Sequence, residues 1–157
     1  MSDNVPLAAA YYLNGVNFRA SAERLMNGLE LDGQGCPTKL NAVPLFFLAS
    51  HAAELFLKAA LLKRGASDSE LKKFNYRHNL SALLLLLQAK EVSVSFETAE
   101  LINGLSEQHA EHALRYTVLF DDGKKTYWPP LALLFSALDE LLLLTRVGDM
   151  SGAGVPS

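Results

Sequence analysis

An apolar segment of helical length, between positions 40 and 64, is the feature that most constrains how this chain can fold. Pro44 suits only the first turn of a helix, so the helix is expected to begin near Asn41, and Gly65 is the expected stop. A helix that is apolar on nearly every side lies in the middle of a bundle or at a subunit contact. Leu55 is therefore expected in the core, with Leu45, Phe46, Phe47, Leu48, Phe56, Leu57, Leu61 and Leu62 as its apolar companions.

Helical spacing also recurs outside this segment. A first helix is expected over residues 5–29, because apolar residues repeat there at steps of three and four. Asn79 is a natural N-cap for a short leucine-rich helix. Alternation of valine and serine over 92–96 resembles a strand, but one short strand would have no partner, so none is expected. The expected face of the first helix consists of Leu7, Tyr11, Gly15, Phe18, Ala22, Leu25 and Leu29.

Together these patterns predict an all-α fold, an up-and-down bundle of about five helices. We expect one domain over residues 1–157, ordered from about 5 to 147, with a flexible tail at 148–157. The expected helices cover residues 5–29, 40–64, 80–90, 97–113 and 131–146, with one further turn at 69–74.

Composition limits the classes of function. The 157 residues carry a formal net charge of -3, so nucleic-acid binding would need a local basic patch. The single cysteine, Cys36, excludes an internal disulfide framework and suggests a reducing compartment. Because the first residues lack a signal peptide pattern and no segment predicts a membrane span, we expect a cytoplasmic protein.

Common catalytic and cofactor motifs are missing from the sequence. The chain has no P-loop, no GxGxxG after a strand and no GxSxG elbow, and Cys36 has no basic neighbour closer than Lys39. His109 and His112 are spaced for one metal ion, but the chain has no HExxH or CxxC, and we interpret the pair as a polar helix rim. The sequence therefore predicts no cofactor, no metal and no catalytic residue.

A polar stripe interrupts the apolar segment. His51, Glu54 and Lys58 are spaced i, i+3 and i+7 and share one helical face. Polar groups buried in such a helix need partners, because each unsatisfied one costs about 1–3 kcal/mol. Two interpretations stay open. One is a Glu54–Lys58 ion pair capped by His51, and the other is a polar pocket shared with His78 and Arg115.

Three short motifs in this order make the chain similar to a known superfamily. Residues 51–58 read HAAELFLK, residues 77–80 read RHNL before a leucine-rich helix, and residues 114–116 read LRY. They resemble prokaryotic members of the HEPN superfamily (higher eukaryotes and prokaryotes nucleotide-binding domains), over roughly residues 10–145. Residues 12–20, YLNGVNFRA, are similar to the first helix of those proteins.

The resemblance implies a bundle of four or five helices that pairs as a homodimer and is connected with RNA or nucleotides. Many members are metal-independent endoribonucleases or partners of nucleotidyltransferases, and the former carry an arginine followed by a histidine after four to six residues. None of the six arginines in this chain, at 19, 24, 64, 77, 115 and 146, has a histidine at that spacing. The candidate ligand-binding residues are His51, Glu54, Lys58, His78, Arg115 and Tyr116.

Three hypotheses on function follow. The first is an RNA- or nucleotide-binding accessory module, acting with a nucleotidyltransferase-type partner in a toxin–antitoxin or defence system. The second is a ribonuclease with a rearranged site of His51, His78 and Arg115, because histidine can act as a general base and arginine can hold phosphate. The third is a purely structural interaction module.

Overall fold

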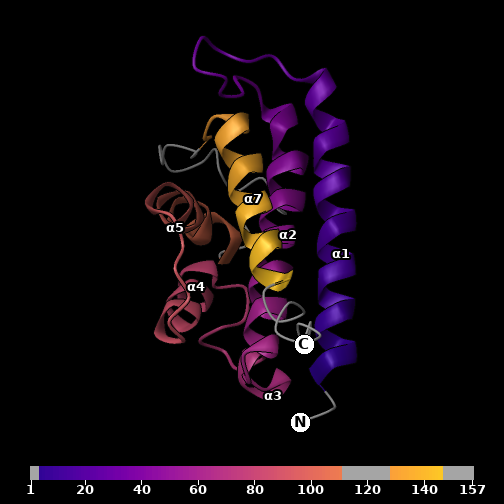
Figure 1. The fold of residues 1–157 in the computed structure, drawn as a ribbon. Helices are drawn as coiled ribbons and strands as arrows, with labels where there is room; N and C mark the ends of the chain where they lie inside the picture. Colours follow the sequence, from indigo (N-terminus) through magenta and orange to yellow (C-terminus); the bar gives the residue numbers. More distant parts are fainter. Residues whose placement is uncertain (1–3, 111–127, 147–157) are drawn as a thin grey trace, which may run out of the picture.

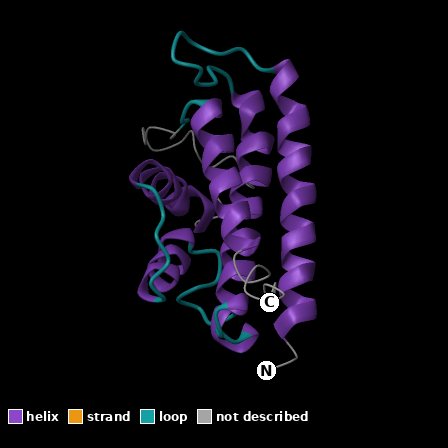
Figure 2. Cartoon of the chain, viewed as in Figure 1, coloured by secondary structure: helices purple, strands orange, loops and turns teal. Residues whose placement is uncertain are grey.

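The computed structural model describes residues 4–110 and 128–146, and in these ranges the chain is helical (Figures 1 and 2). The predicted all-α fold is confirmed: the described residues contain no strand, and Leu31 and Pro37 form an isolated β-bridge. The predicted tail at 148–157 and the last three residues of the helix predicted at 97–113 lie outside the described residues. The helices are α1 (Asn4–Arg24), α2 (Val43–Lys63), α3 (Asp68–Leu71), α4 (Leu80–Ala89), α5 (Phe96–Ala110) and α7 (Leu131–Arg146), with 3-10 turns at Leu25–Gly28 and Leu40–Ala42.

Helix α2 forms the centre of the bundle. Fifteen of its 21 residues are buried, Leu55 among them, so its all-round apolar surface is used within the chain. Helix α1 packs along one side of α2, while α4 and α5 lie on the side away from α1, and α7 packs against α2 and α5 (Figure 1). The segment Leu40–Lys63 is long and apolar enough to cross a membrane, but 78% of its most apolar stretch is buried inside the bundle. It is therefore a core helix.

The contact between α1 and α2 depends on a glycine. A Cβ atom added at Gly15 would lie 2.6 Å from Cε1 of Phe56, whose side chain is fully buried and cannot move aside. Glycine at this position thus lets the two helices approach closely. The predicted face of the first helix is correct as far as Ala22 but wrong at Leu25, which is exposed. Leu25 begins the 3-10 turn Leu25–Gly28. Because a 3-10 helix has three residues per turn and an α-helix has 3.6, the α-helical spacing no longer predicts which side chains face α2.

Capping residues define the helix ends near the site. Asn79 caps α4 as predicted, with its Oδ1 accepting from the backbone N–H of Ala82 at 3.0 Å. Gly65, with φ of +87°, follows α2 in the left-handed conformation expected after a helix end. The turn predicted at 69–74 is shorter and earlier, because Ser67 caps α3 through the N–H of Glu70.

Glu140 on α7 connects the start of α5 to the bundle. Its carboxylate accepts from the backbone N–H of Ser95 at 2.7 Å, from the Ser95 hydroxyl at 2.6 Å and from the Thr98 hydroxyl. Burial would raise the pKa of Glu140, but these hydrogen bonds outweigh it and lower the pKa. Residues 92–96, which were predicted not to form a strand, thus lead into a cap at the start of α5. This cap helps to position α5, which carries His109 near its other end.

Candidate functional site

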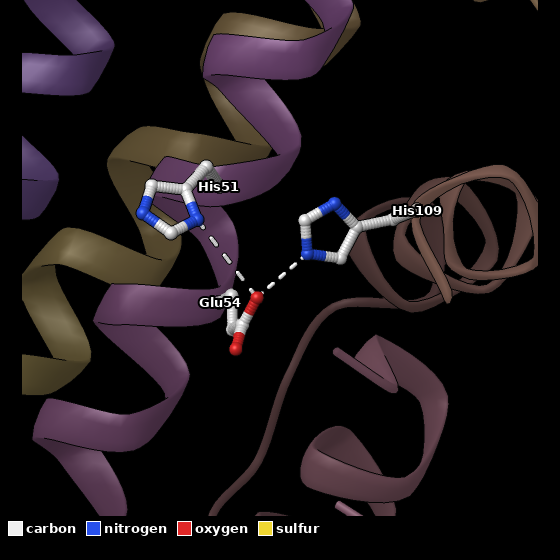
Figure 3. A group of neighbouring side chains, drawn as sticks. All are labelled: His51, Glu54 and His109. Carbon is white, nitrogen blue, oxygen red and sulfur yellow. Dashed lines mark hydrogen bonds and ion pairs between the residues drawn. The ribbon is translucent and has the colours of Figure 1, made fainter. Parts of the chain in front are cut away.

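The candidate site is built around one buried carboxylate. The side chain of Glu54, in the middle of α2, is 2% exposed. Its Oε1 accepts from Nζ of Lys58, one helical turn further on, at 2.6 Å. Its Oε2 accepts from Nε2 of His109, near the end of α5, at 2.6 Å (Figure 3). The two oxygens therefore have separate partners, an ammonium group for Oε1 and an imidazole for Oε2.

Two further histidines approach the same oxygen. Nδ1 of His78 lies 3.1 Å from Oε2 of Glu54, and Nδ1 of His51 lies 3.9 Å from it. The side chains of His51 and His78 are 25% and 22% exposed, whereas that of His109 is nearly fully buried. The cluster thus has a buried end at Glu54 and His109, and it reaches solvent at the other two imidazoles.

Local structure explains how these side chains meet. The spacing 51, 54 and 58 places three of them on one face of α2. His78 adopts the left-handed conformation with φ of +58°, which is uncommon for a residue with a β-carbon and costs roughly 1–3 kcal/mol. The helix cap at Asn79 and the hydrogen bond to Glu54 hold His78 in this conformation.

Aromatic side chains hold the ring of His51. The Phe18 ring meets it edge-on with centroids 4.5 Å apart, and the Phe47 ring lies parallel to it at 6.4 Å. Lys58 lies over the ring of Tyr11, with Nζ 6.0 Å from the centroid. Packing from α1 and α2 therefore restricts the rotamers of two members of the cluster.

The cluster keeps Glu54 ionised. Burial alone would raise the pKa of this carboxyl group, but the hydrogen bond from His109 and the charge and hydrogen bond of Lys58 outweigh burial and hold the pKa well below its usual range. Tyr11 shows the opposite effect. Burial, its 2.8 Å hydrogen bond to Asp68 and the charges of Asp68 and Glu54 raise the pKa of Tyr11 to about 12.

The Glu54–Lys58 ion pair, one of the two interpretations of the polar stripe, is present. His51 and His78 lie beside the same carboxylate, so the ion pair and the link to His78 coexist, while the part of the second interpretation that involves Arg115 stays a prediction. Arg115 and Tyr116, the other two predicted site residues, lie outside the described residues, and so does His112.

His109 was missed as a site residue. It was interpreted as part of a polar rim, and this is wrong, because its side chain is buried against Glu54. The sequence did hold a signal for its burial. His109 follows Ile102 and Leu105 at steps of three and four, so the histidine falls on the buried face of α5.

Comparisons with known proteins give this chain no relative. No protein-family model, no curated protein and no solved structure matches it. The chemistry of the site must therefore be argued from its own residues. An ionised carboxylate facing several imidazoles can orient a histidine as a general base, bind a cation, or stabilise the fold as a buried ion network.

Proposed function

We propose that the chain is an HEPN-like, cytoplasmic RNA- or nucleotide-binding accessory module that works as a homodimer. The observation that carries the proposal is the segment from Lys72 to His78, KKFNYRH, which joins α3 to α4. It combines basic and aromatic side chains, which is the composition of surfaces that bind single-stranded nucleic acids.

Most of the basic and aromatic groups of this segment are available at the surface, while Tyr76 packs against the core. Lys72, Lys73 and Arg77 are exposed, and the segment contains no acidic residue. Lys72 forms an ion pair with Asp68 at 2.5 Å, so the other two cations are the better candidates for phosphate contacts. Phe74 is 93% exposed, so both faces of its ring are open to stacking by a base.

The same segment ends at the buried cluster. His78 is its last residue and hydrogen-bonds Glu54, so a nucleotide bound by the segment would lie beside the imidazoles that reach solvent. The overall charge of -3 opposes non-specific binding of nucleic acid. Because the basic patch is local, we expect the protein to contact a few nucleotides and not a long stretch of nucleic acid.

RNA binding is tested with the variants Phe74→Ala and Arg77→Ala. In fluorescence anisotropy with a labelled single-stranded RNA, Phe74→Ala should weaken binding by about 1–3 kcal/mol, since that is the effect of one base–aromatic stack. Arg77→Ala should weaken it and reduce its salt dependence. Arg24→Ala is the matched control, because Arg24 is exposed and ends α1 at the end of the bundle away from α3 (Figure 1). Equal affinity in all three variants, or no binding by the wild type, would contradict the proposal.

A ribonuclease is the second candidate, and the contact between Glu54 and His78 favours it. A carboxylate on Nδ1 sets the tautomer of an imidazole and leaves Nε2 as the basic nitrogen, the arrangement of a histidine general base. A cleavage time course on the same RNA separates the two functions. Metal-independent cleavage that is lost in His78→Gln, with binding retained, would favour the ribonuclease.

The homodimer is supported by exposed apolar side chains and no longer by α2, whose surface is buried within the chain. Leu133 and Leu143 on α7 and Leu85 on α4 are exposed, as is Phe96 at the start of α5. Covering these side chains in an interface would remove apolar surface from water, and a two-fold dimer is the commonest closed assembly. Light scattering at micromolar concentration should give the mass of a dimer, and Leu133→Glu should shift it toward the monomer. A wild-type monomer would exclude this part of the proposal. A nucleotidyltransferase remains the proposed protein partner.

A further inference from the structure

We infer that His51, Glu54 and His109 form a binding site for a divalent transition-metal ion such as Zn²⁺. This inference goes beyond nucleic-acid binding and does not depend on it. The site joins two residues of the central helix α2 to one residue of α5, which lies beside it (Figure 3).

The donor atoms lie close enough for one ion. One nitrogen from each histidine and one oxygen of Glu54 all lie within 4.8 Å of one another. Neighbouring ligands of a tetrahedral Zn²⁺ lie about 3.3 Å apart, since its bonds to nitrogen and oxygen are about 2.0–2.1 Å long. The distances from Oε2 of Glu54 are 2.6 Å to His109 and 3.9 Å to His51, one on each side of this value. Side-chain rotations that lengthen the first distance and shorten the second would seat an ion.

The donor set favours a transition metal over Mg²⁺ or Ca²⁺. Two imidazoles are borderline ligands that suit Zn²⁺, Co²⁺ and Ni²⁺, and Zn²⁺ also accepts a carboxylate, whereas Mg²⁺ and Ca²⁺ prefer oxygen donors alone. Three protein ligands leave a fourth position, and Nδ1 of His78 is the nearest further donor, 3.1 Å from Oε2. A tetrahedral site can therefore be completed by His78 or by water.

The surroundings prepare the ligands for a cation. Oε1 of Glu54 is held by Lys58, which turns Oε2 toward the imidazoles. The rings of Phe18 and Phe47 pack on His51 and restrict its rotation. The ammonium group of Lys58 opposes a second positive charge, so the affinity should be moderate. The partly exposed side of His51 gives the ion a path inward.

The inference is tested with metal alone, without nucleic acid, on full-length protein freed of any affinity tag and of bound metal by chelator dialysis. Calorimetry should show one Zn²⁺ per chain. Co²⁺ should give the intense visible bands of a tetrahedral site, and Zn²⁺ should abolish them. His51→Gln, Glu54→Gln and His109→Gln should each weaken binding by about tenfold or more.

His112→Gln is the control, because it tests the alternative pair of His109 and His112 suggested by sequence spacing. It should bind Zn²⁺ as the wild type does. Far-UV circular dichroism checks that each variant folds. If His109→Gln does not fold, His51→Gln decides the result, because His51 is the most exposed of the three ligands. Absence of stoichiometric binding, unchanged binding in His51→Gln, or loss in His112→Gln alone would overturn the inference. None of these results depends on whether RNA binds.

Discussion

Replacing Glu54 by alanine is expected to lower the free energy of unfolding by about 3–5 kcal/mol, because it removes one partner of a buried charge cluster. The ammonium group of Lys58 and the imidazole of His109 would both lose their carboxylate, at 2.6 Å each, and remain inside the bundle. Their side chains are 11% and 3% exposed, so both groups would stay largely buried without the carboxylate. Urea denaturation in the presence of a chelator measures the loss and excludes any effect of bound metal.

The matched control is Glu23→Ala. Glu23 also forms an i, i+4 ion pair, with Arg19 at 3.2 Å, but its side chain is mostly exposed. Surface pairs contribute about 0–1 kcal/mol, so this variant should be close to the wild type. A similar small effect for Glu54→Ala would mean that the cluster does not support the fold.

Replacing Phe46 by alanine should cost about 3–5 kcal/mol as well, for a different reason. Phe46 is fully buried in the first turns of α2, and its ring packs on Trp128 with centroids 4.5 Å apart and planes tilted by 52°. Truncation would leave a cavity between the start of α2 and the segment that leads into α7. Trp128 is the only tryptophan in the chain, so its fluorescence reports on this contact directly.

Phe74→Ala provides the control of identical chemistry. Phe74 is almost fully exposed, so the same truncation should change the free energy of unfolding by about 0.5 kcal/mol or less. The expected outcome is a lower urea midpoint and altered tryptophan emission for Phe46→Ala alone. Equal midpoints for the two variants would show that Phe46 is not part of a packed core.

The sequence by itself determined the local features of this protein. The cap at Asn79, the stop at Gly65 and the last helix at 131–146 follow from residues within one or two turns of each position. The polar stripe of α2 follows in the same way, because helical geometry alone places His51, Glu54 and Lys58 on one face. These predictions needed no knowledge of the rest of the chain.

Only the tertiary structure decided which residues complete the site. His78 and His109 lie 24 and 55 residues from Glu54 along the chain, and both meet the same oxygen. The helical periodicity places His109 on one face of α5. It does not predict the axial position of α5 along α2 or the rotation of α5 about its own axis. Those depend on how the apolar faces of several helices pack together, and on anchors such as Glu140 at the start of α5. The contact between His109 and Glu54 therefore follows from helix packing, because a local sequence pattern does not determine how far apart two helix faces lie.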